Sequence, residues 1–163
     1  MKVLVSACLL GVRCRFDGAS KPSQAVQDAL SRHRCEIVRM CPEVMGGMPI
    51  PHPPHEIVEL DGARHVVDAE GADHTENFER GAERACQLAR KTGCSLAILK
   101  AKSPSCGVGQ VYDGTFSGAL VPGDGIAAAR LRAAGVTLLT EKDFVDGDPI
   151  ARASGMSEDA PQD

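Results

Sequence analysis

The sequence predicts a single-domain α/β protein: a mostly parallel four-stranded core sheet with helices on both faces (Rossmann-like) plus a small hairpin. The chain has 163 residues, 43% of them apolar and 25% charged, as expected for one globular domain. Short apolar runs alternate with segments of helical spacing, which favours a parallel sheet with helical connections. Residues 2–8 form a near-continuous apolar run with β-branched members, typical of a strand buried on both faces.

The first strand–helix–strand unit is expected within residues 2–40. After a loop over residues 9–21, Ser23 can cap a helix with apolar positions at helical spacing. Residues 35–40 form the second strand. Such a unit suggests a parallel strand pair joined by a right-handed crossover.

The middle of the chain begins with a stretch rich in glycine and proline, from Cys41 to Pro54. Prolines this dense do not fit a central strand or a helix interior, so an extended, stiffened loop is expected. Loops of this length in a compact domain are usually functional. Residues 56–60 and 64–67, joined by an Asp-Gly pair, predict a hairpin. A helix should then run from Thr75 to Gly93.

The last part of the domain repeats the alternation. Residues 95–99 form the third core strand, followed by a long loop through Gly118. Asp124 can cap the last helix, and residues 136–140 give the fourth strand. The domain is therefore expected to span residues 1–144, with residues 145–163 as a polar, acidic and flexible tail.

Charge and composition exclude several classes of protein. The net charge is −4 and the pI about 5.7, which argues against a general nucleic-acid binder. The chain has no Trp and one Tyr, so base stacking on aromatic platforms is not expected. No run of eighteen apolar residues predicts a membrane span, and the N-terminus has no cleavage pattern of a signal peptide. A cytoplasmic location is expected; the sequence does not indicate an oligomeric state.

Three of the seven cysteines follow the ends of separate predicted strands. These are Cys8, Cys41 and Cys106. Because ligands of open parallel sheets bind outside the carboxyl ends of the strands, these thiols are expected to meet in one crevice. Cys14 could join them from the loop that starts there. Each could instead be an ordinary core residue, but together the three predict a metal or iron–sulfur site.

The remaining cysteines are expected to have structural roles. Cys35 and Cys94 begin strands and so lie at the opposite edge of the sheet, and Cys86 lies mid-helix. Structural zinc sites commonly use close Cys-x-x-Cys pairs, which this chain lacks. Iron–sulfur clusters normally use four cysteines, so a cluster held by three would keep one iron open. Lys100 and Lys102, near Cys106, should favour thiolates.

Other polar residues near these strand ends are weaker candidates. Glu43 could be a general acid or base in the crevice, or only a carboxylate in the first turn of a helix. Ser103 could orient a substrate or a water molecule, or form a turn with Pro104. His52 and His55 could be ligands, but histidines in a proline-rich loop are more often surface groups.

Four motifs together resemble one family of proteins. They are Val-Ser-Ala-Cys-Leu-Leu-Gly at 5–11, Cys-Pro-Glu-x-x-Gly-Gly at 41–47, Leu-Lys-x-x-Ser-Pro-Ser-Cys-Gly at 99–107 and Tyr-Asp-Gly-Thr-Phe at 112–116. In this order they resemble a bacterial domain-of-unknown-function family that includes thiouracil desulfidase, over residues 1 to about 144. In that enzyme three cysteines hold a [4Fe-4S] cluster with one free iron. Its reaction converts 2-thiouracil to uracil and sulfide without net redox change.

The resemblance implies specific roles in this chain. Cys8, Cys41 and Cys106 would be the cluster ligands, Glu43 the catalytic glutamate and Ser103 the catalytic serine. Ser105, the next candidate, would help to bind the substrate, a small thiolated nucleobase. Phe16 and His52 stand where relatives often have Tyr and Arg, so the substrate is less firmly indicated than the cluster.

Two other functions stay open at this point. One is a non-enzymatic iron–sulfur or sulfur-carrier module that passes sulfur to a partner. The other is a zinc- or thiol-based hydrolase. These would differ from a desulfidase in turnover and in their colour and activity in air.

Overall fold

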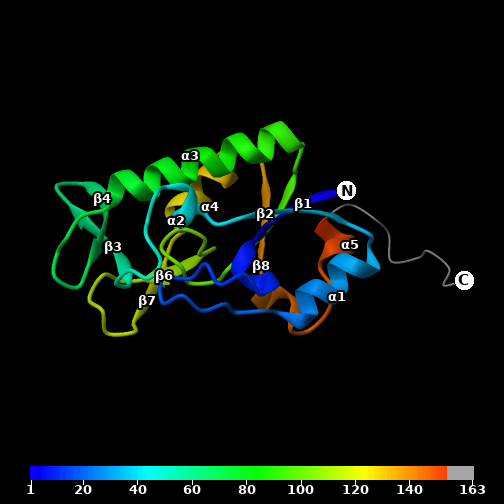
Figure 1. Ribbon diagram of the computed structural model, residues 1–163, viewed down its shortest axis with the longest axis horizontal. Helices are drawn as coiled ribbons and strands as arrows, with labels where there is room; N and C mark the ends of the chain where they lie inside the picture. The colour runs from blue at the N-terminus through cyan, green and yellow to red at the C-terminus, as the bar shows by residue number, and fades with distance from the viewer. Residues whose placement is uncertain (154–163) are drawn as a thin grey trace, which may run out of the picture.

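A parallel four-stranded sheet forms the centre of the protein in the computed structural model, which describes residues 1–153 (Figure 1). The strand order is β2-β1-β5-β8, and all three pairings are parallel. The strands are β1 (Lys2–Ser6), β2 (Glu36–Met40), β5 (Leu96–Leu99) and β8 (Thr137–Thr140). The predicted fold class is confirmed.

Helices cover both faces of this sheet. One face packs against α1 and the C-terminal elements, and the other against α3 and α4. The bounds are α1 (Gln24–Arg32), α3 (Thr75–Thr92), α4 (Ile126–Ala133), η2 (Glu141–Phe144) and α5 (Ile150–Ala153). As predicted, Ser23 caps α1, its side chain accepting the N–H of Val26, and Gly93 ends α3 in the left-handed conformation.

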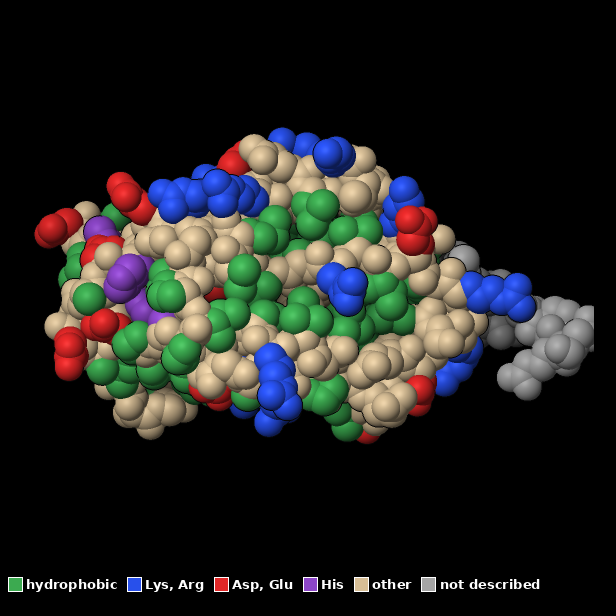
Figure 2. Space-filling view, in the orientation of Figure 1, with side chains coloured by type: hydrophobic (Ala, Val, Ile, Leu, Met, Phe, Trp, Pro, Cys, Tyr) green, Lys and Arg blue, Asp and Glu red, His purple; other side chains and the backbone are tan. Residues whose placement is uncertain are grey.

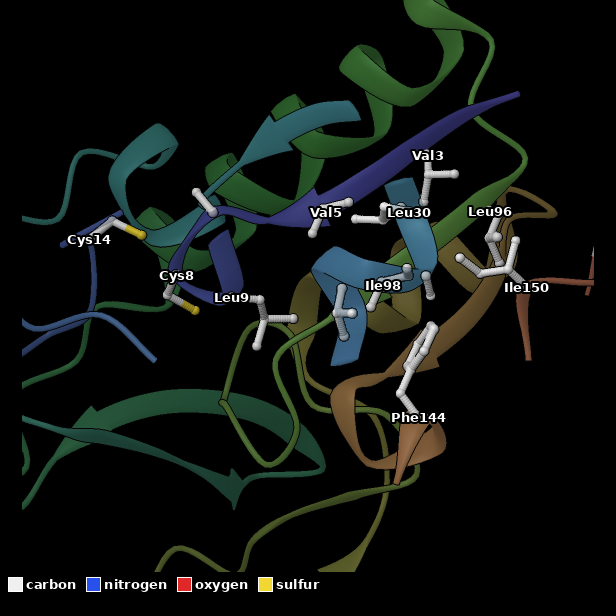
Figure 3. Packing of buried hydrophobic residues seen from close by; sticks show 13 residues of the cluster. Val3, Val5, Cys8, Leu9, Cys14, Leu30, Leu96, Ile98, Phe144 and Ile150 are labelled. Atoms are coloured by element: carbon white, nitrogen blue, oxygen red, sulfur yellow. The ribbon is translucent and has the colours of Figure 1, made fainter. Parts of the chain in front are cut away.

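Alternate side chains of β1 serve the two cores. Val3 and Val5 pack with Leu30 and Ile98 on the α1 face, as Figure 3 shows, whereas Leu4 packs on the α3 face. All of these side chains are fully or almost fully buried, and each contributes about 1.5–3 kcal/mol by leaving water. The ends of β1 and β5 are therefore held rigidly, which fixes the residues that follow them.

Two small hairpins extend from the sheet. β3 (His55–Leu60) and β4 (Ala63–Asp68) pair antiparallel, as predicted, and lie at the end of the molecule opposite α1 (Figure 1). The second hairpin was not predicted: β6 (Gln110–Tyr112) lies in the segment predicted to be a loop through Gly118, and its partner β7 (Leu120–Pro122) follows that segment. Strands of three residues are too short to show a period-two pattern in the sequence.

Local predictions at three helix starts are corrected. Residues 42–45 form a short helix, α2 (Pro42–Met45), instead of an extended loop, because proline is favourable at the first helical position. The first strand ends at Ser6 and is followed by a 3-10 helix, η1 (Ala7–Leu10). Gly125, and not Asp124, is the N-cap residue of α4; the Asp124 carboxylate instead accepts from the Gly109 N–H and binds Arg132.

The packed chain extends beyond the predicted domain end at residue 144. Ile150 is completely buried in the core on the α1 face. The segment just after Phe144 is therefore part of the folded domain, because this apolar side chain docks between the sheet and α1. The rest of the predicted acidic tail, residues 154–163, lies outside the described residues. Among residues 1–153, none of the helices has the length and apolarity needed to cross a membrane.

Candidate active site

A cavity of about 290 Å³ lies at the carboxyl ends of β1, β2 and β5. Its volume is close to the lower limit of ligand pockets, about 300–1,000 Å³. Four cysteines line it, namely Cys8, Cys14, Cys41 and Cys106. Glu43 and Ser103 line the same cavity. The structure thus brings together five of the six site residues predicted from the sequence, and Cys14 lies with them, a possibility that the sequence left open.

Cys8 is positioned by the turn that follows β1. It lies in η1, and its backbone carbonyl accepts hydrogen bonds from the N–H groups of Gly11 and Lys21. Gly11 has φ 90°, a left-handed conformation that suits glycine. Figure 3 shows Cys8 and Cys14 just beyond the end of β1, and both side chains are buried.

Cys41 is positioned by close packing of α2 on α3. A Cβ atom added to Gly46 would lie 1.9 Å from the carbonyl oxygen of Asn77, and one added to Gly81 would lie 1.9 Å from that of Pro42. Only glycine permits such a backbone approach. Cys41 is the N-cap residue of α2, so this contact also sets the position of its thiol.

Side chains of α3 hold the other end of α2. Asn77 and Arg80 donate to the Gly46 carbonyl at 3.0 and 3.1 Å, and Arg84 donates to that of Met45. These donors satisfy carbonyls that a helix end leaves unpaired. The short helix carrying Glu43 in its first turn is therefore fixed at its C-terminal end.

Cys106 lies in a tight turn organised by two serines. Ser103 Oγ accepts the N–H groups of Ser105 and Cys106, both at 3.1 Å. Ser6 Oγ donates to Cys106 Sγ at 3.4 Å and accepts the Lys100 N–H at 3.0 Å. Ser6 was missed in the sequence because it stands inside an apolar run, where a buried hydroxyl gives no signal of its own.

Ser105 lies behind this turn, away from the cavity. Its side chain is only 1% exposed and does not line the pocket. Its carbonyl accepts the N–H groups of Ala127 and Ala128 in the first turn of α4. Ser105 therefore anchors the turn to α4 and contacts Ser103 Oγ at 3.3 Å, but it does not line the cavity.

Glu43 shares a hydrogen bond with a buried histidine. Its Oε1 lies 3.3 Å from His52 Nε2, and the His52 side chain is 4% exposed. The expectation that His52 is a surface group is wrong, because the proline-rich loop folds back over α2. The hydrogen bond to Glu43 is the main cause that raises the pKa of His52, against the opposing effect of burial.

The tautomer of His52 follows from its second contact. His52 Nδ1 lies 2.7 Å from the carbonyl oxygen of Pro53, and a carbonyl can only accept. Nδ1 therefore carries a hydrogen and donates. Nε2 and Glu43 Oε1 are consequently bridged by one proton, which belongs to either group.

The thiols of Cys14, Cys41 and Cys106 favour their protonated forms in this structure. Burial is the largest cause raising the pKa of Cys106 to about 12. The pKa of Cys41 is also raised, mainly by its hydrogen bond with Cys14 and then by burial. A hydrogen bond from Cys41 lowers the pKa of Cys14, but the bond to Cys8 and burial outweigh it and raise the value to about 11. These buried sulfurs need a bound cation to be stable as thiolates.

The lysines near Cys106 do not supply that positive charge. Lys100 Nζ pairs with the Glu141 carboxylate at 2.8 Å and also donates to the Ala101 carbonyl. The expectation that nearby lysines lower the pKa of the Cys106 thiol is therefore wrong here, since burial dominates.

The donor set fits a polynuclear cluster better than a single ion. Within residues 1–153, no group of three or more His, Cys, Asp or Glu side chains is arranged to hold one metal ion. In an iron–sulfur cluster each cysteine binds a different iron, so the sulfurs stand further apart than around one ion. Cys8, Cys41 and Cys106 come from three separate segments and line one cavity, the donor type that such a cluster takes.

Histidine and acidic residues gather at the far end of the pocket. Figure 2 shows histidine side chains clustered at the end of the molecule that carries β3 and β4. His55 and Glu56 of β3 line the cavity. Burial lowers the pKa of His55, whose Nε2 lies 2.8 Å from His74 Nδ1. Sequence reasoning missed Glu56, because an acidic residue at the start of a hairpin strand has no distinguishing pattern.

Comparisons with known proteins agree on one family. The family described as 2-thiouracil desulfurase matches residues 3–143. A Bacillus subtilis (strain 168) protein, the uncharacterized protein YbbK, is 37% identical over 150 residues, covering 88% of this chain and 98% of that protein. A solved structure of the [4Fe-4S]-dependent thiouracil desulfidase TudS is 40% identical, with a TM-score of 0.80 over 94% of this chain and 98% of that one.

Proposed function

Because this chain belongs to the 2-thiouracil desulfurase family, we propose that it hydrolyses the carbon–sulfur bond of a thiolated pyrimidine, converting 2-thiouracil to uracil and sulfide without net redox change. It is a [4Fe-4S]-dependent desulfidase. One observation carries the proposal for its site: cysteines that follow three different core strands line one cavity, together with a carboxylate and a hydroxyl.

Cys8, Cys41 and Cys106 would hold the cluster in this cavity. When bound, it supplies an iron with no protein ligand, a Lewis acid with affinity for sulfur that makes the attached carbon more electrophilic. Cys14 is the remaining cysteine in the cavity and is left without a cluster role. Three of the four cysteines that line the cavity are buried, and Cys41 is half-buried.

Glu43 is the group placed to handle the proton of the attacking water. Hydrolysis of a thiocarbonyl needs one water and yields a carbonyl and hydrosulfide, so protons must leave the oxygen. A carboxylate acts as general base when it lies within reach of that water. His52, which shares a proton with Glu43 at 3.3 Å, can hold the proton or return it without exposing the site to solvent.

Ser103 is the group placed to donate a hydrogen bond. Both acceptor sites of its Oγ are taken by the N–H groups of Ser105 and Cys106. Its own hydrogen is therefore left to donate, either to Ser105 Oγ at 3.3 Å or to a ligand in the cavity. A donor here can stabilise negative charge that develops on the pyrimidine as water adds.

Anaerobic reconstitution with a thiouracil assay tests this function. We expect iron and acid-labile sulfide in a 4:4 ratio, a brown protein, and release of hydrosulfide with uracil. The variant Cys106→Ser should lose the full cluster, whereas Cys14→Ser and the remote Cys86→Ser should keep it. A full cluster in Cys106→Ser would show that the ligand assignment is wrong.

The same assay separates the alternative functions. A sulfur carrier would bind sulfur stoichiometrically without turnover. A zinc- or thiol-based hydrolase would be colourless and active in air. The small thiolated nucleobase as partner and the cytoplasmic location stay predictions.

A further inference from the structure

The carboxylate of Glu56 is fixed at the wall of the cavity. Its Oε1 accepts hydrogen bonds from the N–H groups of Gly114 and Phe116, at 3.0 and 3.2 Å. The loop that carries these groups packs tightly on β3, since a Cβ added to Gly114 would lie 2.8 Å from the Ile57 carbonyl oxygen. Glu56 is 9% exposed, so its side chain has little freedom to move. Figure 1 shows how close β6 and its loop lie to β3.

The second oxygen of Glu56 has no protein partner. No described residue donates a hydrogen bond to Oε2, and no cation within residues 1–153 pairs with Glu56. Within residues 1–153, every side-chain oxygen that is buried has a hydrogen-bond partner. Oε2 has none, so it is not buried and must reach open space. Glu56 lines the cavity, so the cavity is open space beside this side chain.

A fixed carboxylate oxygen with free lone pairs can only accept hydrogen bonds. The ring of 2-thiouracil presents N–H groups on both sides of the thiocarbonyl carbon, and each can only donate. A site built to bind such a group rejects analogues that lack it, because its own polar atom is then left unpaired. Arg15, Lys100 and Lys102 also line the cavity, but their side chains carry only hydrogen-bond donors and cannot provide this acceptor.

We propose that Glu56 Oε2 accepts a hydrogen bond from a ring N–H of the substrate beside the thiocarbonyl carbon, and so selects thiopyrimidines that carry a proton there. The inference rests on the proposed function. It makes Glu56 a specificity-determining residue, distinct from the groups that hold the cluster or move protons. It also explains why the Tyr-Asp-Gly-Thr-Phe loop is bound to β3 through this side chain.

The variant Glu56→Gln separates recognition from structure. The amide oxygen of Gln can still accept from the N–H groups of Gly114 and Phe116. The flipped amide is disfavoured, because it would place the NH₂ group against these two donors. The NH₂ group then takes the place of Oε2 and opposes a substrate N–H. Folding, cluster content and kcat should stay close to those of the wild type, while binding weakens.

The experiment uses the anaerobic holoenzyme and two readouts. The first is the Kd of uracil by calorimetric titration, which needs no turnover. The second is kcat and KM with 2-thiouracil and with its 1-methyl and 3-methyl derivatives. Glu59→Gln is the matched control, since Glu59 is exposed on the same strand. Loss of a hydrogen bond to a charged group should raise the Kd of uracil and the KM about tenfold to hundredfold in Glu56→Gln.

The methylated substrates identify the contact. The wild type should discriminate against one of the two N-methyl derivatives, and Glu56→Gln should lose most of that discrimination. The inference is overturned if Glu56→Gln binds uracil as tightly as the wild type, if both enzymes discriminate equally, or if uracil does not bind the wild type. Failure of the proposed function would look different: uracil would bind in a Glu56-dependent way, but no sulfide would be released from 2-thiouracil.

Discussion

The two edges of the core sheet carry the same residue type in different surroundings. At the carboxyl edge, Cys14 forms hydrogen bonds with both Cys8 and Cys41, and all three line one cavity with Cys106. At the amino edge, the Cys94 thiol lies 3.3 Å from the Thr92 hydroxyl. All seven cysteines are free thiols. Position relative to strand direction, and not residue type, therefore separates the cysteines of the site from those of the core.

The largest expected effect is the loss of a ligand at the carboxyl edge. Cys41→Ser should abolish the full cluster and lower turnover of 2-thiouracil by at least about a thousandfold, because the metal supplies several kcal/mol of transition-state stabilisation. Cys94→Ser, at the amino edge, should keep both. Iron analysis and sulfide release under anaerobic conditions measure the two variants. Equal cluster content in both would remove the distinction between the edges.

The next largest effect concerns a residue that shares the cavity but does not bind the cluster. Glu43→Gln should lower kcat by about a hundredfold to ten-thousandfold, the usual contribution of general acid–base catalysis. Its iron and sulfide content should equal that of the wild type. Glu36→Gln, an exposed change on β2, is the control and should have no effect on either. An unchanged kcat in Glu43→Gln would exclude Glu43 as the base.

A third test changes a residue that lies outside the cavity but positions α2. Gly81→Ala places a methyl group 1.9 Å from the Pro42 carbonyl oxygen, so α2 must move away from α3. Such overpacking should lower the free energy of unfolding by about 1–3 kcal/mol and also reduce cluster retention, because α2 carries Cys41. Gln87→Ala, exposed on α3, should change stability by less than about 0.5 kcal/mol. Denaturant unfolding and iron analysis measure both effects.

The sequence predicts some features of the site and not others. The parallel four-stranded sheet and the meeting of Cys8, Cys41 and Cys106 could be predicted from apolar runs and strand direction, whereas the strand order was not predicted. The place of Ser105 behind its turn could not be predicted, because it depends on backbone hydrogen bonds to α4. The burial of His52 could not either, since it results from the path of a proline-rich loop across α2.

Glu56 shows the same limit most clearly. Its carboxylate is held by two N–H groups that lie 58 and 60 residues further along the chain. No periodicity or spacing in the sequence reports such a contact, because it needs both the β3–β4 hairpin and the loop after β6 in place. Residues that bind the cofactor are predicted from strand ends, whereas residues that select the substrate come from the loops that close over it.

The smallest expected effect tests whether His52 and Glu43 share a proton. The hydrogen bond with Glu43 raises the pKa of His52, so the stabilisation it provides is fully present below the unfolded pKa, about 6.5, and is lost as pH rises through the folded pKa. Denaturant unfolding of the cluster-free protein should show His52→Gln less stable than the wild type by about 1 kcal/mol at pH 6, and a smaller difference at pH 9. In a Glu43→Gln background the pH dependence of this difference should disappear, because the partner that raises the pKa is gone. A difference that grows toward pH 9 would mean that burial outweighs the hydrogen bond and lowers the pKa of His52 in the folded protein, contrary to this prediction.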